Sequence, residues 1–224
     1  PKSTSAQPLA VGVYDIVFET SERMTLCGAS FELHRGECLA IVTQGNDAGS
    51  FLLEIAAGFR RPLVGEVRHG DLMLDFDQRQ TTMVALQPPR PALDLRLTVW
   101  QWLSYCASLD GINSTASPAI DSALEVLGLE DIKKSPLDTL GEGELTLVDL
   151  ASLLLMPRSA YLLDGTLDRL DETQSARVKT LIRTTIEQGG SVLITTKHPM
   201  LIEDIASRVL RLHNGRIQPD KATG

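Results

Sequence analysis

The sequence lacks the basic excess, the paired cysteines and the long apolar runs that mark several common classes of protein. Its 224 residues include 21 lysines and arginines against 29 aspartates and glutamates, a formal net charge of −8. This balance argues against binding nucleic acid or acidic lipid through a basic surface. The three cysteines, Cys27, Cys38 and Cys106, are too few and too scattered for a disulfide framework. We therefore expect reduced thiols and a cytoplasmic protein.

No apolar run approaches the roughly 20 residues that cross a bilayer as a helix. Residues 1–8 also lack the charged and apolar regions of a signal peptide, so we expect no direct insertion into a membrane. Aromatic residues make up only 4% of the chain, but hydrophobic residues make up 43% and charged residues 22%. That balance is typical of a globular protein with a buried core, and it argues against disorder.

Strand and helix patterns alternate along most of the chain. Small polar residues flanked by proline at 1–8 predict a loose leader. Apolar runs and alternation predict strands at 9–18, 29–33, 38–42, 161–164, 191–195 and 209–212, and short strands within 63–86. Apolar residues at helical spacing predict helices at 50–57, 144–155 and 172–188. This alternation indicates an α/β fold with a mostly parallel sheet.

The segment from 98 to 129 has helical spacing without an intervening strand, which predicts an inserted helical segment. It begins with an aromatic cluster. Trp100 and Leu103 fit the buried face of a helix, which leaves Trp102 as the candidate exposed anchor for a protein partner.

Five landmarks in the chain follow one another at the separations found in a known family. An apolar strand, a loop with two glycines and a helix form the layout in which helix N-terminal amides hold phosphate. The landmarks are IVTQGNDAGSFLLEIAAG at 41–58, Gln87 followed by LTV at 97–99, LGEGE at 140–144, Asp164 followed by Leu170-Asp171, and ASRVLRLHNGRI at 206–217. Over residues 9–217 the chain resembles the ATP-binding cassette (ABC) ATPase domain of ABC transporters, with its phosphate loop, Q-loop, signature, Walker B strand, D-loop and closing strand.

The resemblance implies a P-loop NTPase-like fold with an N-terminal antiparallel β part and a mostly parallel core sheet. A helical subdomain at about 92–155 would be inserted into the domain at 9–217, and 218–224 would form a tail. The implied partners are a transmembrane permease and either a second copy of the chain or another ABC ATPase subunit. The protein would then lie at the inner face of a membrane, held there by its partner.

The resemblance also implies the residues that would contact ATP and Mg²⁺. The cofactor-binding positions are Ser50, Gln87, Asp164, Phe18 and Gly143. Of these, Ser50, Gln87 and Asp164 would be the metal ligands. Ser50 fits equally well as a helix N-cap. Phe18, or Tyr14 in its place, would stack on adenine, although an aromatic residue in a strand more often belongs to the core.

Several positions depart from the family pattern at columns that bind the phosphates of ATP or catalyse their hydrolysis. Gly49 stands where the family has the lysine that neutralises the β- and γ-phosphates, and Gly165 replaces the carboxylate that polarises the attacking water. Lys197 replaces the switch histidine; it either faces solvent, as His198 beside it would, or supplies a cation from a different loop. Asp168 is most simply a solvated loop acid.

The phosphate loop and the signature have lost small residues as well. Thr43, Asn46 and Ala48 replace loop glycines, and Asp47 adds a carboxylate. In the signature Gly141 replaces the serine and Glu142 replaces a glycine, although acids in a first turn suit the helix dipole.

We therefore expect a degenerate cassette, a pseudo-ATPase that binds ATP and Mg²⁺ weakly or not at all and has a structural or regulatory role in a transporter-like complex. One alternative is an ATP-binding subunit of an active heterodimeric ABC transporter that couples ATP hydrolysis to transport. The other is a cytosolic scaffold or binding module unrelated to transport.

Overall fold

The computed structural model describes residues 7–21, 24–44, 48–77, 84–109, 111–112 and 117–219. One sheet is antiparallel and contains β1 (Leu9–Glu19), β2 (Met24–His34), β4 (Val64–His69) and β5 (Leu72–Met73), in the order β2-β1-β4-β5. The other contains β3 (Cys38–Thr43), β6 (Val84–Gln87), β7 (Ala160–Asp164), β8 (Ser191–Thr196), β9 (Arg208–His213) and β10 (Arg216–Pro219), in the order β10-β9-β3-β8-β7-β6.

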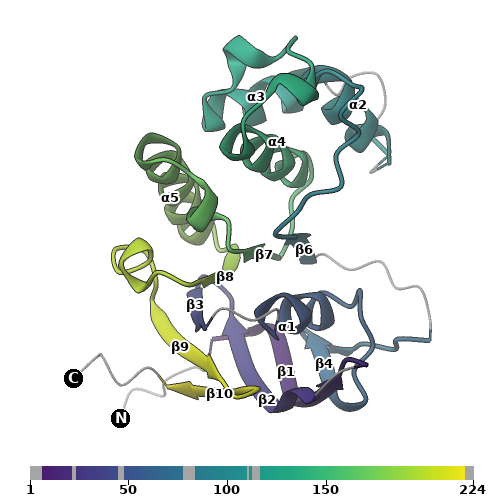
Figure 1. The fold of residues 1–224 in the computed structure, drawn as a ribbon, viewed down its shortest axis with the longest axis vertical. Coiled ribbons are helices and arrows are strands. Elements are labelled where there is room, and N and C mark those ends of the chain that lie inside the picture. The colour runs from purple at the N-terminus through teal and green to yellow at the C-terminus, as the bar shows by residue number, and fades with distance from the viewer. Residues whose placement is uncertain are drawn as a thin grey trace.

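The helices are α1 (Ala48–Ala56), α2 (Val99–Leu109), α3 (Ser117–Leu127), α4 (Glu142–Leu154) and α5 (Glu172–Glu187). A short 3₁₀ helix, η3 (Leu167–Arg169), follows β7. In the second sheet β3, β6, β7, β8 and β9 pair in parallel, and β10 pairs antiparallel with β9. The predicted class, an antiparallel β part beside a mostly parallel sheet with inserted helices, is confirmed (Figure 1).

The central strand β3 explains why its sequence is an unbroken apolar run. All six of its residues are buried. Because side chains alternate along a strand, Leu39 and Ile41 enter one core cluster while Cys38 and Ala40 enter the other. The sheet is thus covered on both faces, as is typical of parallel sheets.

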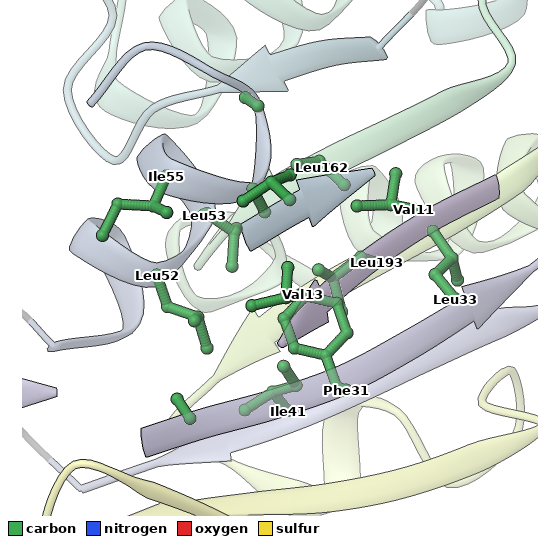
Figure 2. Packing of buried hydrophobic residues seen from close by; sticks show 14 of the residues in the cluster. Val11, Val13, Phe31, Leu33, Ile41, Leu52, Leu53, Ile55, Leu162 and Leu193 are labelled. Atoms are coloured by element: carbon green, nitrogen blue, oxygen red, sulfur yellow. The ribbon is translucent and has the colours of Figure 1, made fainter. Parts of the chain in front are cut away.

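The first cluster joins the two sheets through α1. Leu52, Leu53 and Ile55 of α1 lie close to residues of the antiparallel sheet, such as Val13, and of the parallel sheet, such as Leu162 (Figure 2). Helix α1 ends where Gly58 adopts φ +83°, a left-handed conformation that glycine tolerates without strain. This packing fixes the start of α1 against the carboxyl end of β3.

The second cluster lies on the other face of the parallel sheet and includes residues of α2 to α5. Helices α2, α3 and α4 form a group beyond the β6 and β7 side of the sheet (Figure 1). Their place agrees with the inserted helical segment, although its limits at 92 and 155 stay a prediction. No helix in the part of the chain described is long and apolar enough to cross a bilayer.

Two strand predictions need correction. β2 begins at Met24 rather than at residue 29, since it pairs with β1 along nearly its whole length despite Gly28. β10 was not predicted, because its sequence RIQP is short and ends in proline. It extends to Pro219, two residues into the segment predicted as a tail.

Candidate functional site

A cavity of about 820 Å³ opens at the carboxyl ends of the parallel strands, beside the first turn of α1. Ligands of open α/β sheets bind in this position. It is lined by Thr43, Gly49, Ser50, Phe51, Glu54, Pro88, Pro89, Arg90, Asp164, Gly165, Asp168, Arg169, Thr195, Thr196, Lys197 and His198. The structure therefore brings together Gly49, Ser50, Asp164, Gly165 and Lys197 from the sequence prediction.

Asp164 ends β7 and is buried, with 7% of its surface exposed. Its Oδ1 accepts a hydrogen bond from Thr195 Oγ1 at 2.7 Å, and Thr195 Oγ1 in turn accepts one from the Gly165 amide at 3.0 Å. Gly165 has φ +59°, a left-handed conformation that disfavours a side chain. The turn after β7 is thus built around a glycine at the position where the resemblance places a catalytic carboxylate.

The first turn of α1 approaches Thr43 closely. Gly49 is buried, and a Cβ atom at this position would lie 2.8 Å from Thr43 Cγ2. Ser50 is half-buried at the cavity wall. Because α1 begins at Ala48, Ser50 lies inside the first turn, and its interpretation as the N-cap is wrong. Asn46 and Asp47 lie outside the described residues.

Gln87 is not in the cavity. Its side chain is completely buried beside α4: Nε2 donates to the Thr146 carbonyl oxygen at 2.8 Å, and Oε1 accepts from Thr166 Oγ1 at 2.7 Å. The predicted set of Ser50, Gln87 and Asp164 as joint metal ligands is therefore not assembled in this structure, because both ends of the Gln87 amide are occupied elsewhere.

Asp168 is not the solvated loop acid that the sequence suggested. Its carboxylate accepts hydrogen bonds from Thr196 Oγ1 and, at 3.1 Å, from the Lys197 amide. It therefore connects η3 to the loop after β8. Local sequence patterns do not predict this contact, since Thr196 lies 28 residues away. The side chains of Lys197 and His198 are exposed at the cavity rim.

Arg169 is a cavity residue that sequence reasoning missed. Its Nη1 donates to the Asp164 carbonyl oxygen at 3.1 Å and its Nε to Thr146 Oγ1 at 3.3 Å. Burial lowers the pKa of the guanidinium, while nearby carboxylates, first that of Asp164, raise it. Two of its nitrogens thus bond to β7 and α4, whereas Nη2 is buried without a hydrogen-bond partner among the described residues.

Phe18 and Tyr14 belong to the packing of the antiparallel sheet. The Phe18 ring is 9% exposed and its centroid lies 5.1 Å from that of Phe51, with the Arg60 guanidinium 5.4 Å from the Phe18 centroid. Tyr14 donates from its hydroxyl to Glu32 at 2.8 Å. Neither aromatic residue lines the cavity; Phe51 does.

Gly143 lies in the first turn of α4, against the start of α5. A Cβ at this position would lie 2.4 Å from Gln174 Oε1, so any side chain at 143 would displace the end of the Gln174 side chain. Glu144 Oε2 accepts from the Gly141 amide at 2.9 Å, and Glu142 is exposed. The signature turn therefore caps its own helix and does not line the cavity of its own chain.

A second hollow, of about 620 Å³, lies where the chain enters α2. It is lined by Ala92, Leu93, Asp94, Leu97, Trp102 and Tyr105. Trp102 is half-buried and its Nε1 is buried without a hydrogen-bond partner among the described residues, whereas Tyr105 is 50% exposed. The predicted exposed anchor Trp102 thus forms part of the wall of this hollow, and Tyr105 is the more exposed ring.

Comparison with known proteins decides the family. A family model described as ABC transporter matches residues 26–167, more than half of the chain. The chain belongs to the ABC transporter family. It is 30% identical over 184 residues to the cytochrome c biogenesis ATP-binding export protein CcmA of Pseudomonas putida, covering 81% of this chain and 86% of the relative. With the protein of the same name from Agrobacterium fabrum it shares 29% over 178 residues, covering 78% and 82%.

Solved structures support the same ABC fold. A nucleotide-free ATP-binding cassette from an ABC transporter superposes with a TM-score of 0.80 at 15% identity, over 93% of this chain and 89% of that one. An ATP-binding subunit of an ABC transporter also gives a TM-score of 0.80, at 20% identity, over 94% and 90%. At these identities the likeness concerns the fold alone.

Proposed function

We propose that this chain is a cassette subunit of an ABC transporter-like membrane complex in which it has a structural or regulatory role and hydrolyses ATP slowly or not at all. One observation carries the proposal. At the cavity formed by the strand ends, the two positions that would supply the phosphate-binding cation and the catalytic carboxylate are Gly49 and Gly165. Close packing against Thr43 favours glycine at 49, and a left-handed backbone conformation favours it at 165.

The residues of the cavity do not fit Mg²⁺ and a triphosphate well. Ser50 and Asp164 offer a hydroxyl and a carboxylate to a cation, but Asp164 already accepts from Thr195 and Gln87 faces away. Arg169, the buried cation nearby, is bonded to Asp164 and Thr146. The lining still contains cations, Arg90, Arg169 and Lys197, but none of them stands at position 49. The phosphates would also meet the carboxylates of Asp164 and Asp168, which supports weak binding or none.

The partners we propose are a transmembrane permease and a second cassette subunit, either another copy or a different chain. The relatives are named as ATP-binding export proteins, which supports a place in a membrane transport complex. The hollow lined by Leu97, Trp102 and Tyr105 supplies an apolar surface with a ring that is still half exposed, and we propose it as the contact with the permease. The chain would then be peripheral to the membrane.

Phosphate release from Mg-ATP tests the proposal. The purified chain, measured with malachite green, should release phosphate at the rate of the Asp164→Ala variant, because neither has a complete site. Turnover by the wild type that Asp164→Ala abolishes would refute the pseudo-ATPase assignment.

Reconstitution with a permease and an intact cassette subunit distinguishes the proposed function from its main alternative, an active heterodimeric transporter. Exposed Glu142 begins the helix that would face the partner's nucleotide in an active heterodimer. Turnover of the complex should not change in the Glu142→Gly variant if this chain is only structural. A change in turnover would favour the active heterodimer instead.

A further inference from the structure

Gln87 lies at the centre of a buried group of polar side chains that connects three elements. It ends β6, Thr146 and Asp149 lie on α4, and Thr166 precedes η3. Gln87 and Thr166 are completely buried, and Thr146 and Asp149 are 1% and 8% exposed. Polar groups so deeply buried are retained only where hydrogen bonds compensate for lost water.

The amide of Gln87 uses both its ends within this group. Its Nε2 donates to the carbonyl oxygen of Thr146 at 2.8 Å, and its Oε1 accepts from Thr166 Oγ1 at 2.7 Å. The carboxyl of Asp149 is buried in the same group, and the Gln87 amide lowers the pKa of this carboxyl against the rise that burial causes. Moving Gln87 into the cavity would break both of these hydrogen bonds and leave two buried polar groups unpaired, which is costly.

Arg169, beside this group, connects α4 to the carboxyl end of β7. Arg169 of η3 donates from Nε to Thr146 Oγ1 at 3.3 Å and from Nη1 to the Asp164 carbonyl oxygen at 3.1 Å. Helices α2, α3 and α4 form one group beyond the β6 and β7 side of the sheet (Figure 1). Contacts of α4 with β6 and η3 therefore determine how firmly this group is attached to the sheet.

We propose that Gln87, Thr146, Asp149 and Thr166 form a latch that holds the helical group against the parallel sheet and keeps the Gln87 amide out of the cavity. The inference deepens the proposed function and rests on it, because a fixed helical group suits a subunit that does not cycle with ATP. Thr166 is decisive, since its hydroxyl is the donor that holds Gln87 Oε1 in place.

Hydrogen–deuterium exchange of the full chain, without nucleotide, tests the latch. In Thr166→Val the hydroxyl is replaced by a methyl group of similar size. We expect the amides of α4 and β6 to exchange roughly tenfold faster, as loss of one buried hydrogen bond implies. Amides of β3 and β8 should keep their wild-type rates. Thr166→Ser, which keeps the hydroxyl, should restore slow exchange in α4.

A matched control is Thr180→Val on α5, whose hydroxyl donates only to Ala176 within its own helix. It should leave α4 exchange unchanged. If Thr166→Val exchanges like the wild type in α4, or if exchange rises equally in β3 and β8 through general destabilisation, the latch is wrong. Because the measurement contains no nucleotide, phosphate release by the wild type would refute the proposed function without changing this result.

Discussion

Thr43 at the end of β3 and Gly49 in the first turn of α1 face each other so closely that a Cβ at Gly49 would lie 2.8 Å from Thr43 Cγ2. The two positions are therefore coupled: the threonine methyl group occupies space that any side chain at 49 would need to cross. Gly49 is also buried, so the contact cannot be relieved by moving outward. Threonine at position 43, where the family has glycine, therefore disfavours a lysine at position 49.

The first prediction concerns restoring that lysine. Gly49→Lys alone should destabilise the protein by about 1–3 kcal/mol through overpacking and should not bind a fluorescent ATP analogue. Adding Thr43→Gly should recover much of the lost stability, so the two changes are non-additive in a double-mutant cycle of urea unfolding. Gly49→Ala serves as the control, because it brings the Cβ without the charge. Additive effects would show that the two positions are independent.

A second prediction concerns the turn after β7. Gly165→Glu would place the missing carboxylate at φ +59°, where a residue with a Cβ costs about 1–2 kcal/mol. We expect lower stability in urea unfolding and no gain in phosphate release. Gly165→Asn is the matched control, since asparagine tolerates this conformation better and should cost less. Equal stability of the wild type and Gly165→Glu would contradict the prediction.

The sequence predicted the parts of the fold that depend on periodicity. The unbroken apolar run of β3 and the spacing of α1 depend on local pattern and are confirmed. The site positions Gly49 and Asp164 came from the resemblance to the ABC ATPase domain, and both line the cavity. Contacts between residues far apart in the sequence could not be predicted from the local spacing of residue types. Asp168 bonds to Thr196, and Gln87 turns to α4 and Thr166, only because the chain has folded.

A third prediction tests the proposed permease contact. Tyr105→Ala should reduce recovery of the chain with its co-expressed permease from membranes by roughly tenfold, as expected for an exposed aromatic anchor. Leu109→Ala is the control: it lies on the same helix, is 69% exposed and does not line the hollow. An equal loss in both variants would indicate a general effect on α2, and no loss in either would place the permease elsewhere.

The last prediction follows from the buried carboxyl of Asp149. Burial raises its pKa from 3.8 to about 6, and the hydrogen bond from Gln87 and the charge of Arg169 oppose that rise. Between these two values the folded protein binds more protons than the unfolded chain, so the free energy of unfolding falls as pH rises from about 4 to about 6 and then levels off. The total change is on the order of 3 kcal/mol for a shift of this size.

Urea unfolding at a series of pH values measures this contribution as the difference between the wild type and Asp149→Asn, in which the titration is removed. Other groups, including His69, whose pKa is lowered by burial, contribute equally to both proteins and cancel. The difference should decline from pH 4 to about 6 and stay constant above. Asp138→Asn, at an exposed position, is the control for removing one carboxylate elsewhere on the chain. A flat curve for Asp149→Asn would mean that the carboxyl gains enough water or charge compensation to titrate as in the unfolded chain, and that the polar group around Gln87 is less buried than the structure indicates.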